Sequence, residues 1–399
     1  MSGRKMQSIT VMRGANRSCA RVARRLTLVA AVLLCGQVSL GTPIAVTVGP
    51  WHVTFANNGD RVNYGGDRFR GEKNWTQAEM DDVAAMLTEW DSHITTAYPP
   101  RPIELKLMWN GLGTGVLGSS FNSYEGDGTH AWTEVEYLWR QHQNPNNTAD
   151  SFIEFGTGVT WNTGSQLPAS NAVDFRSVVL HEIGHTLGFF TTYNSTTDTW
   201  WSNGITAWDA LLRDATTGGN SPLDNSTGTP GNFNQLASPV YFVGTNAMHA
   251  YGDRPVPVYA PPTYSGGSSL SHLDTATFPN ALMKHAISYG ASVRTPTVLE
   301  WRIMQDLGWD VTLTFLPGDA NRDGVVDQAD YTVWYNHYGG SGGWEQGDFN
   351  DDGLVDQADY TLWYNNYGSS SPVPEPTTML LMVASMGILR VRRRRGVCA

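Results

Sequence analysis

The spacing of apolar side chains changes along the chain, and each change predicts a different element. From Trp75 to Asp91, apolar residues recur at helical spacing, which predicts an amphipathic helix. The segments Ile103 to Trp109 and Ser151 to Trp161 are rich in β-branched and aromatic residues and are bounded by Gly, Pro and Asn, which predicts strands. Residues 46–316 contain no repeat, so we expect them to form one mixed α+β domain.

Two later stretches depart from this pattern. Residues 192–270 are dense in Gly, Ser, Thr, Asn and Pro, which predicts a loop-rich insertion with a single helical segment at Ala207 to Asp214. After Gly318, the run GDANRDGVVDQADYTVWYNHYG recurs 29 residues later as GDFNDDGLVDQADYTLWYNNYG. This internal duplication defines a second module at residues 317–368.

The two ends of the chain have the composition of processing signals. Residues 1–45 begin with basic side chains and no acid, and an apolar run from Leu26 to Leu34 follows, which predicts a signal peptide and export. At the other end, a linker with a Pro-Glu-Pro motif (369–376) precedes an apolar segment and a basic tail (377–399). This order resembles the PEP-CTERM sorting tail of Gram-negative bacteria, which implies an exosortase-type processing enzyme and delivery to the cell surface. A short membrane anchor is the alternative.

Removing both end segments changes the charge of the protein. Twelve of the 26 basic side chains but only one of the 37 acidic side chains lie in them, so the body between carries a net charge near −22. Such a surface argues against nucleic acid and anionic membranes as partners and suggests that some acids hold cations. All three cysteines, Cys19, Cys35 and Cys398, lie near the ends, so the body is expected to contain no disulfide.

The run HEIGH lies within DFRSVVLHEIGHTLGFF (residues 174–190), whose apolar residues fall on one face of a predicted helix. His181 and His185 are one helical turn apart, so both imidazoles point the same way, as two ligands of one metal ion require. Glu182 stands beside them at an angle suited to a water on the metal rather than to the metal itself. The run therefore predicts a zinc site with Glu182 as general base.

A catalytic zinc site also needs a third protein ligand and an open fourth position for water. The chain offers several candidates downstream of HEIGH, which are His249, His272, His285, Asp209 and Glu300. Spacing alone does not choose between them.

The residues around these candidates carry a family resemblance. HEIGHTLGF resembles the metzincin pattern HExxHxxGxxH as far as its glycine, but Thr191 stands where the third histidine of the short form would be. The later runs SHLD and ALM resemble the leishmanolysin-like branch of the metzincins, in which an insertion precedes a distant histidine and a methionine-containing turn. The resemblance implies His272 as third ligand, ahead of Asp209 and then Glu300. It also implies Met283 as the Met-turn residue, in a metzincin-like catalytic domain with a twisted mixed sheet and an active-site helix.

Together with export, this resemblance implies an endopeptidase that binds one catalytic Zn²⁺ and hydrolyses protein or peptide substrates, with Glu182 taking a proton from the attacking water. Some metzincins carry a tyrosine two residues after the Met-turn methionine to steady the tetrahedral intermediate. Here that place is occupied by His285, the candidate transition-state stabiliser. The competing function is a calcium-dependent surface adhesion or matrix protein with a vestigial peptidase domain, and the presence of Glu182 favours the enzyme.

Each copy of the duplication carries oxygen ligands at the spacing of a twelve-residue calcium loop, with glycine at position 6 for a sharp turn. Position 7 contributes its backbone carbonyl. The predicted ligands of two Ca²⁺ ions are Asp319, Asn321, Asp323, Val325, Asp327 and Asp330 in the first copy, and Asp348, Asn350, Asp352, Leu354, Asp356 and Asp359 in the second.

This loop-then-helix duplication resembles the type I dockerin. The resemblance implies a small all-α, EF-hand-like module that docks to a cohesin-like partner. The helices at Tyr331 to Tyr338 and Tyr360 to Tyr367 are the candidate docking face, although their aromatic residues could equally form the core of the module.

Overall fold

The computed structural model describes residues 43–64, 67–113, 115–122, 124–126, 130–141, 149–194, 199–200, 204–215, 239–313, 316–321, 324–350 and 352–370. The chain divides into two compact units, of which the first ends at Leu313 and the second begins at Thr314. Most of the predicted signal peptide and the whole predicted sorting tail lie outside the described residues. Within the described ranges, no helix is long and apolar enough to cross a membrane.

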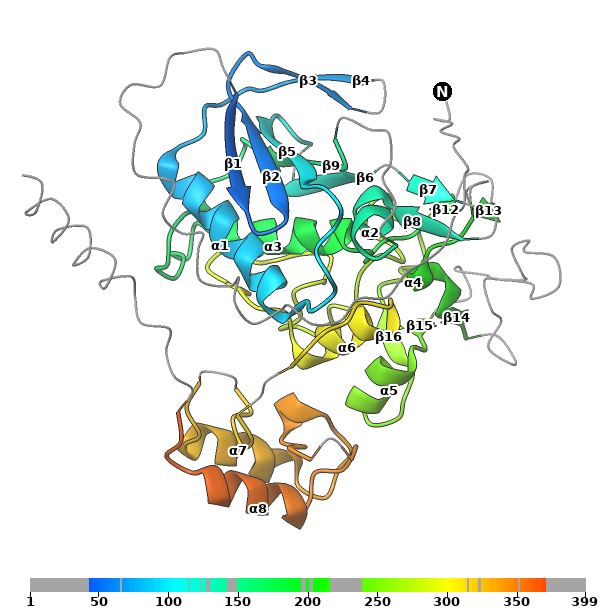
Figure 1. Ribbon diagram of the computed structural model, residues 1–399. Coiled ribbons are helices and arrows are strands. Elements are labelled where there is room, and N and C mark those ends of the chain that lie inside the picture. Colours follow the sequence, from blue (N-terminus) through cyan, green and yellow to red (C-terminus); the bar gives the residue numbers. More distant parts are fainter. Residues whose placement is uncertain are drawn as a thin grey trace, which may run out of the picture. The chain divides into compact units, whose positions relative to one another are not determined.

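A five-stranded sheet is the frame of the first unit, and its strands run in the order β1-β2-β5-β9-β6 (Figure 1). Strands β2, β5 and β9 are parallel, whereas β1 and β6 pair antiparallel at the two edges. The bounds are β1 (Ile44–Val48), β2 (Trp51–Ala56), β5 (Ile103–Asn110), β6 (Gly118–Asn122) and β9 (Ser151–Gly156). Strand β5 confirms the first predicted strand. The strand predicted from Ser151 to Trp161 ends at Gly156 instead, because its partner β5 ends at Asn110.

Different elements cover the two faces of this sheet. On one face lie α1 (Gln77–His93), which confirms the predicted amphipathic helix, and α3 (Phe175–Thr186), which packs along it (Figure 1). On the other face, Met108 and Phe152 pack against a hairpin of β3 (Arg61–Tyr64) and β4 (Asp67–Arg70). Because both faces are covered, β9 is buried along its whole length.

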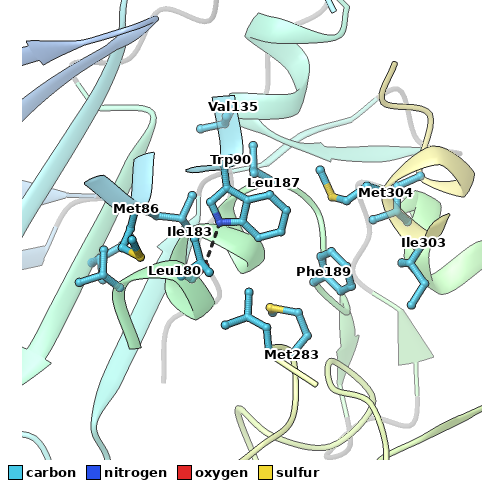
Figure 2. Packing of buried hydrophobic residues seen from close by; sticks show 14 of the residues in the cluster. Met86, Trp90, Val135, Leu180, Ile183, Leu187, Phe189, Met283, Ile303 and Met304 are labelled. Carbon is cyan, nitrogen blue, oxygen red and sulfur yellow. Dashed lines mark hydrogen bonds between the residues drawn. The ribbon is translucent and has the colours of Figure 1, made fainter. Parts of the chain in front are cut away.

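The contact between α1 and α3 is held by a tryptophan at its centre. The Trp90 indole N–H donates a hydrogen bond of 3.0 Å to the Leu180 carbonyl of α3, and Met86, Ile183 and Leu187 lie around it (Figure 2). The Trp90 ring also meets Trp301 edge to face, with 4.9 Å between centroids. Trp301 belongs to α6 (Val298–Asp306). The predicted metal-binding helix is thus fixed by large buried aromatic side chains.

The remaining elements of the first unit are short. They are α2 (Glu134–Trp139), α4 (Ala207–Ala210), α5 (Thr245–Ala250), β7 (Tyr124–Gly126), β8 (Ala131–Thr133), β10 (Trp161–Asn162), β11 (Val173–Asp174), β12 (Tyr193–Asn194), β13 (Thr199–Trp200), β14 (Leu212–Asp214), β15 (Val240–Phe242) and β16 (Val256–Val258). The prediction of one helix at Ala207 to Asp214 was wrong in two respects. Its second half is strand β14, because Leu212 to Asp214 pair with β15, and a second helix, α5, follows in the same region.

The second unit contains α7 (Gln328–His337), a 3₁₀ turn (Trp344–Gln346) and α8 (Gln357–Asn366). Its two halves are joined by reciprocal bonds. The Trp334 indole of α7 donates to the Asp356 carbonyl in the second loop, and the Trp363 indole of α8 donates to the Asp327 carbonyl in the first, both at 2.9 Å. Trp334 and Trp363 are buried, so these aromatics form the core of the unit. Four exposed tyrosines accompany the two helices: Tyr335 on α7, Tyr364 on α8, and Tyr338 and Tyr367 directly after them.

Candidate metal centre

Helix α3 presents two histidines because its two ends are fixed. The Asp174 carboxylate caps the N-terminus by accepting from the Ser177 N–H at 3.1 Å. At the other end, Gly188 adopts φ +115°, a conformation that favours glycine and reverses the chain after the helix. His181 and His185 lie one turn apart between these ends, and His185 is buried.

The third histidine, His272, lies in a loop far from α3 in the sequence. Leu270 has φ +69°, an uncommon conformation for a bulky residue, and its carbonyl accepts from the Trp208 indole. Two residues later, the His272 carbonyl accepts a hydrogen bond of 2.8 Å from the Tyr259 N–H. This strained turn directs the buried His272 ring toward α3, where it stacks on His181 with 5.1 Å between centroids.

All three rings are oriented through Nδ1 by a backbone carbonyl. His181 bonds to the Leu282 carbonyl at 2.8 Å, and His185 bonds to the Phe189 carbonyl at 2.6 Å. His272 bonds to the Ser268 carbonyl at 2.8 Å. A carbonyl oxygen only accepts, so each Nδ1 carries the proton and each Nε2 has a free lone pair. Such outer bonds are typical of metal-binding histidines, because they fix the tautomer and the ring orientation.

The three Nε2 atoms converge on one point. The Nε2 of His181 lies 3.1 Å from the Nε2 of His185 and 3.1 Å from the Nε2 of His272. Two nitrogen ligands held 2.0–2.1 Å from one tetrahedral ion would lie about 3.4 Å apart, so the spacing fits a metal ion. Since no Nε2 carries a proton, these short distances bring lone pairs together, which a cation between them would stabilise. The cluster can therefore hold a metal ion, as its ligand atoms all lie within 4.8 Å of one another.

The electrostatics of the cluster favour neutral imidazoles, which are the form that binds metal. Burial, together with neighbouring His185, lowers the pKa of His181 to about 3. Burial likewise lowers the pKa of His185 to about 4. The pKa of His272 lies well below its ordinary value for the same reason, with further contributions from the other two rings. At neutral pH, protons therefore do not compete for these Nε2 atoms.

Glu182 faces a cleft of about 530 Å³ beside the three histidines. It is buried, and burial raises the pKa of its carboxyl to about 8. A cation at the histidine cluster would act in the opposite direction, because a nearby positive charge favours the ionised carboxylate. The backbone of β6 passes close by: a Cβ added to Gly118 would lie 2.5 Å from the Glu182 Oε1. The absence of a side chain at this glycine therefore leaves room for the carboxylate.

Met283, the predicted Met-turn residue, packs against the helix that carries His181 and His185. It is fully buried and belongs to the same apolar cluster as Ile183 of α3 (Figure 2). A Cβ added to Gly184, the residue before His185, would lie 2.5 Å from the Met283 sulfur. The Met283 side chain thus supports the helical turn that carries the histidines.

The other candidate ligands lie outside the histidine cluster, and each has another contact. The buried Asp209 carboxylate accepts from the Thr192 N–H and hydroxyl at 2.9 and 2.8 Å, and Glu300 accepts from the Met283 N–H.

The two histidine candidates also have other partners. His249 pairs with Asp253 at 3.3 Å. His285 lines the cleft, where its ring stacks on Tyr259 with 3.7 Å between centroids and its Nδ1 lies 2.8 Å from the Thr275 hydroxyl.

Sequence reasoning missed the groups that orient the ligands. Three of them are the carbonyls of Ser268, Leu282 and Phe189, and a backbone carbonyl leaves no mark in a sequence. Gly188 was the one available signal, since a glycine after a helix marks the turn that brings the Phe189 carbonyl back to His185. Gly118 carried no recognisable signal, because its role depends on a contact with a distant helix.

The two predicted calcium loops have matching hydrogen bonds. Asp330 accepts from the Asn321 and Asp327 N–H groups, and Asp359 accepts from the equivalent Asn350 and Asp356 N–H groups, all at 2.8–3.1 Å. The glycine at position 6 has φ +85° in both loops. Asp323, a predicted ligand, lies outside the described residues.

Buried like charges make the second loop a candidate cation site. Burial, together with the nearby carboxylates of Asp359 and Asp352, raises the pKa of Asp348 to about 6. Asp359, whose charge acts on Asp348, is itself fully buried. A divalent cation would relieve this repulsion, and its preferred oxygen ligands are the groups present.

Comparisons with known proteins find few similarities. No family model matches the chain, and no curated protein matches it. Among solved structures, the chain is similar to the type II cohesin-dockerin domain from Bacteroides cellolosolvens, with 27% sequence identity over 16% of this chain and 100% of that chain, at a TM-score of 0.14.

Proposed function

We propose that this protein is an exported zinc-dependent endopeptidase. The observation that carries the proposal is the convergence of three unprotonated Nε2 atoms, two of them from buried residues, at a spacing that fits one tetrahedral ion. Three histidines with an open fourth position are the ligand set of catalytic zinc sites, whereas structural sites use four protein ligands. His181, His185 and His272 would hold the ion. When bound, zinc would polarise the scissile carbonyl and acidify a water molecule.

The protein's own groups would carry out the proton transfers. Glu182 is the carboxylate that follows His181 on α3 and faces the cleft, so it is placed to take a proton from the attacking water. The same carboxylic acid would then give that proton to the leaving amine nitrogen. A role for His285 in steadying the negatively charged intermediate remains part of this proposal, because it lines the same cleft.

The shape of the cleft supports a peptide as substrate. Gly118, Ser119 and Ser120 of β6 line it, and in the described part of the chain β6 is an edge strand whose sheet partner is β9. An exposed sheet edge offers a row of backbone groups to an extended chain, which can bind there as an added strand. A peptide bound in this way would lie across the cleft that contains Glu182.

The substitution Glu182→Gln tests the function directly. It keeps the size of the side chain but removes the base, so zinc content should remain at about one ion per chain, while cleavage of denatured protein should fall ~10²- to 10⁴-fold. The same change at Glu154, a buried glutamate that does not line the cleft, is the matched control and should leave the rate unchanged.

Metal content must be measured on every sample, because only equal occupancy makes the rates comparable. A zinc-loaded parent that cut no member of a broad peptide library would refute the peptidase proposal and favour the adhesion function. A Glu182→Gln variant as fast as the parent would remove Glu182 from the mechanism.

For the second unit, we propose a calcium-binding module with one ion in each loop. The buried acidic pairs and the paired glycine turns support this assignment. The sequence resemblance to dockerins adds a proposed partner, a cohesin-like module. The exposed tyrosines of α7 and α8 offer a surface for it, since tyrosine is enriched at protein interfaces.

A further inference from the structure

Glu300, a sequence candidate for zinc binding, has a different place in the fold. It is fully buried at the start of α6, where it forms a capping box with Thr297. Its Oε2 accepts from the Thr297 N–H and hydroxyl, each at 2.8 Å. Its Oε1 is turned the other way and accepts from the Met283 N–H. One carboxylate therefore ties the helix cap to the Met283 segment.

The Met283 segment is in turn bonded to both parts of the histidine cluster. The Leu282 carbonyl accepts from His181 Nδ1 at 2.8 Å. The Met283 carbonyl accepts at 2.8 Å from the N–H of Leu273, the residue after His272. Two of the three ligands, which come from distant parts of the chain, thus take their positions from the same short segment.

The structure assigns Glu300 the role of a positioning residue for the metal centre, which acts by fixing the backbone at Met283. This inference rests on the proposed zinc site. A helix cap alone needs only the Oε2 side of the carboxylate. Glu79 of α1 shows this, because its Oε2 forms the same box with Thr76 while its Oε1 accepts from the Lys73 ammonium. Without Glu300, the buried Met283 N–H would lose its acceptor, and the segment would be free to shift away from His181.

Three variants of the full-length protein separate positioning from capping. Glu300→Ala removes both bonds, Thr297→Ala weakens the cap but keeps the bond to Met283, and Glu79→Ala removes the equivalent box on α1. We expect the zinc dissociation constant to rise about 10- to 100-fold in Glu300→Ala, the range found when groups behind metal ligands are lost. The other two variants should stay within about twofold of the parent.

A second readout reports ligand geometry rather than stability. With cobalt(II) in place of zinc, the visible absorption of Glu300→Ala should differ from the parent, whereas Thr297→Ala and Glu79→Ala should keep the parent spectrum. If Glu300→Ala bound zinc as tightly as the parent while losing stability to the same extent as Glu79→Ala, Glu300 would be a helix cap only. A parent that bound no zinc would instead refute the proposed function itself.

A measurement on the parent covers the case in which Glu300→Ala does not fold. The Met283 amide should be strongly protected from hydrogen exchange in the zinc-free protein, because Glu300 holds it without help from the metal. Rapid exchange of this amide would overturn the assignment.

Discussion

The histidine cluster and the predicted calcium loops are both candidate cation sites, yet their candidate ligands are arranged in opposite ways. The three imidazoles come from two segments far apart in the sequence, helix α3 and the loop at His272, and their Nε2 atoms already converge. In each loop the ligands lie within twelve consecutive residues, but the carboxylates of Asp330 and Asp359 are bonded to N–H groups of their own loop. In the described part of these loops, no three acidic side chains gather as the histidines do.

The difference shows what holds each ligand before a cation binds. The histidines are positioned by a large aromatic core and by backbone carbonyls, neither of which needs metal. The second unit has a small core, and buried acids such as Asp348 repel one another within it. We therefore expect metal removal to leave the first site intact in shape and to destabilise the second unit as a whole.

Calcium removal should give the largest effect and tests this comparison directly. One site contributes about 4 kcal/mol of stability when free calcium exceeds its dissociation constant 1,000-fold. Chelation should therefore unfold much of residues 316–370, while the first unit keeps its protection. Hydrogen exchange read by segment would check this, and equal protection of 316–370 with and without calcium would contradict it.

Loss of a proposed zinc ligand should have a large effect on zinc affinity and a small effect on the fold. His272→Ala is expected to weaken zinc binding by at least about 100-fold, or about 2.8 kcal/mol, because it removes one of three ligands. His249→Ala, on the partly exposed helix α5, is the control and should bind zinc as the parent does. If zinc affinity survived in His272→Ala but was lost in Asp209→Ala, the assignment of the third ligand would be wrong.

The smallest expected effect is on kcat, when the space that Gly118 leaves for the proposed base Glu182 is filled. In Gly118→Ala the added methyl would overlap the Glu182 carboxylate, so kcat should fall about 10- to 100-fold at unchanged zinc content. Gly266 lines the same cleft, but a Cβ there meets nothing within 4 Å, which makes Gly266→Ala the matched control. Equal kcat values for the two variants would show that the close approach of β6 does not position Glu182.

The features that could be predicted from the sequence are those encoded over a few residues. His181 and His185 share a helical face, and the calcium loops are contiguous, so both follow from spacing. The approach of His272 was predicted only through a family resemblance, since it depends on the turn at Leu270 and the pairing with Tyr259. The helix predicted at Ala207 to Asp214 failed for a similar reason, because pairing with a distant strand overrode the local pattern.

The reciprocal tryptophan bonds of the second unit limit how it can be divided. Each indole donates to a backbone carbonyl of the other copy, so a chain cut after the first copy would leave Trp334 without its acceptor and Asp327 without its donor. One copy alone therefore lacks two hydrogen bonds that the intact pair contains. Because the acceptors are carbonyls, substitutions at Asp327 or Asp356 would preserve the link, so the two loops can diverge in sequence and still depend on each other to fold.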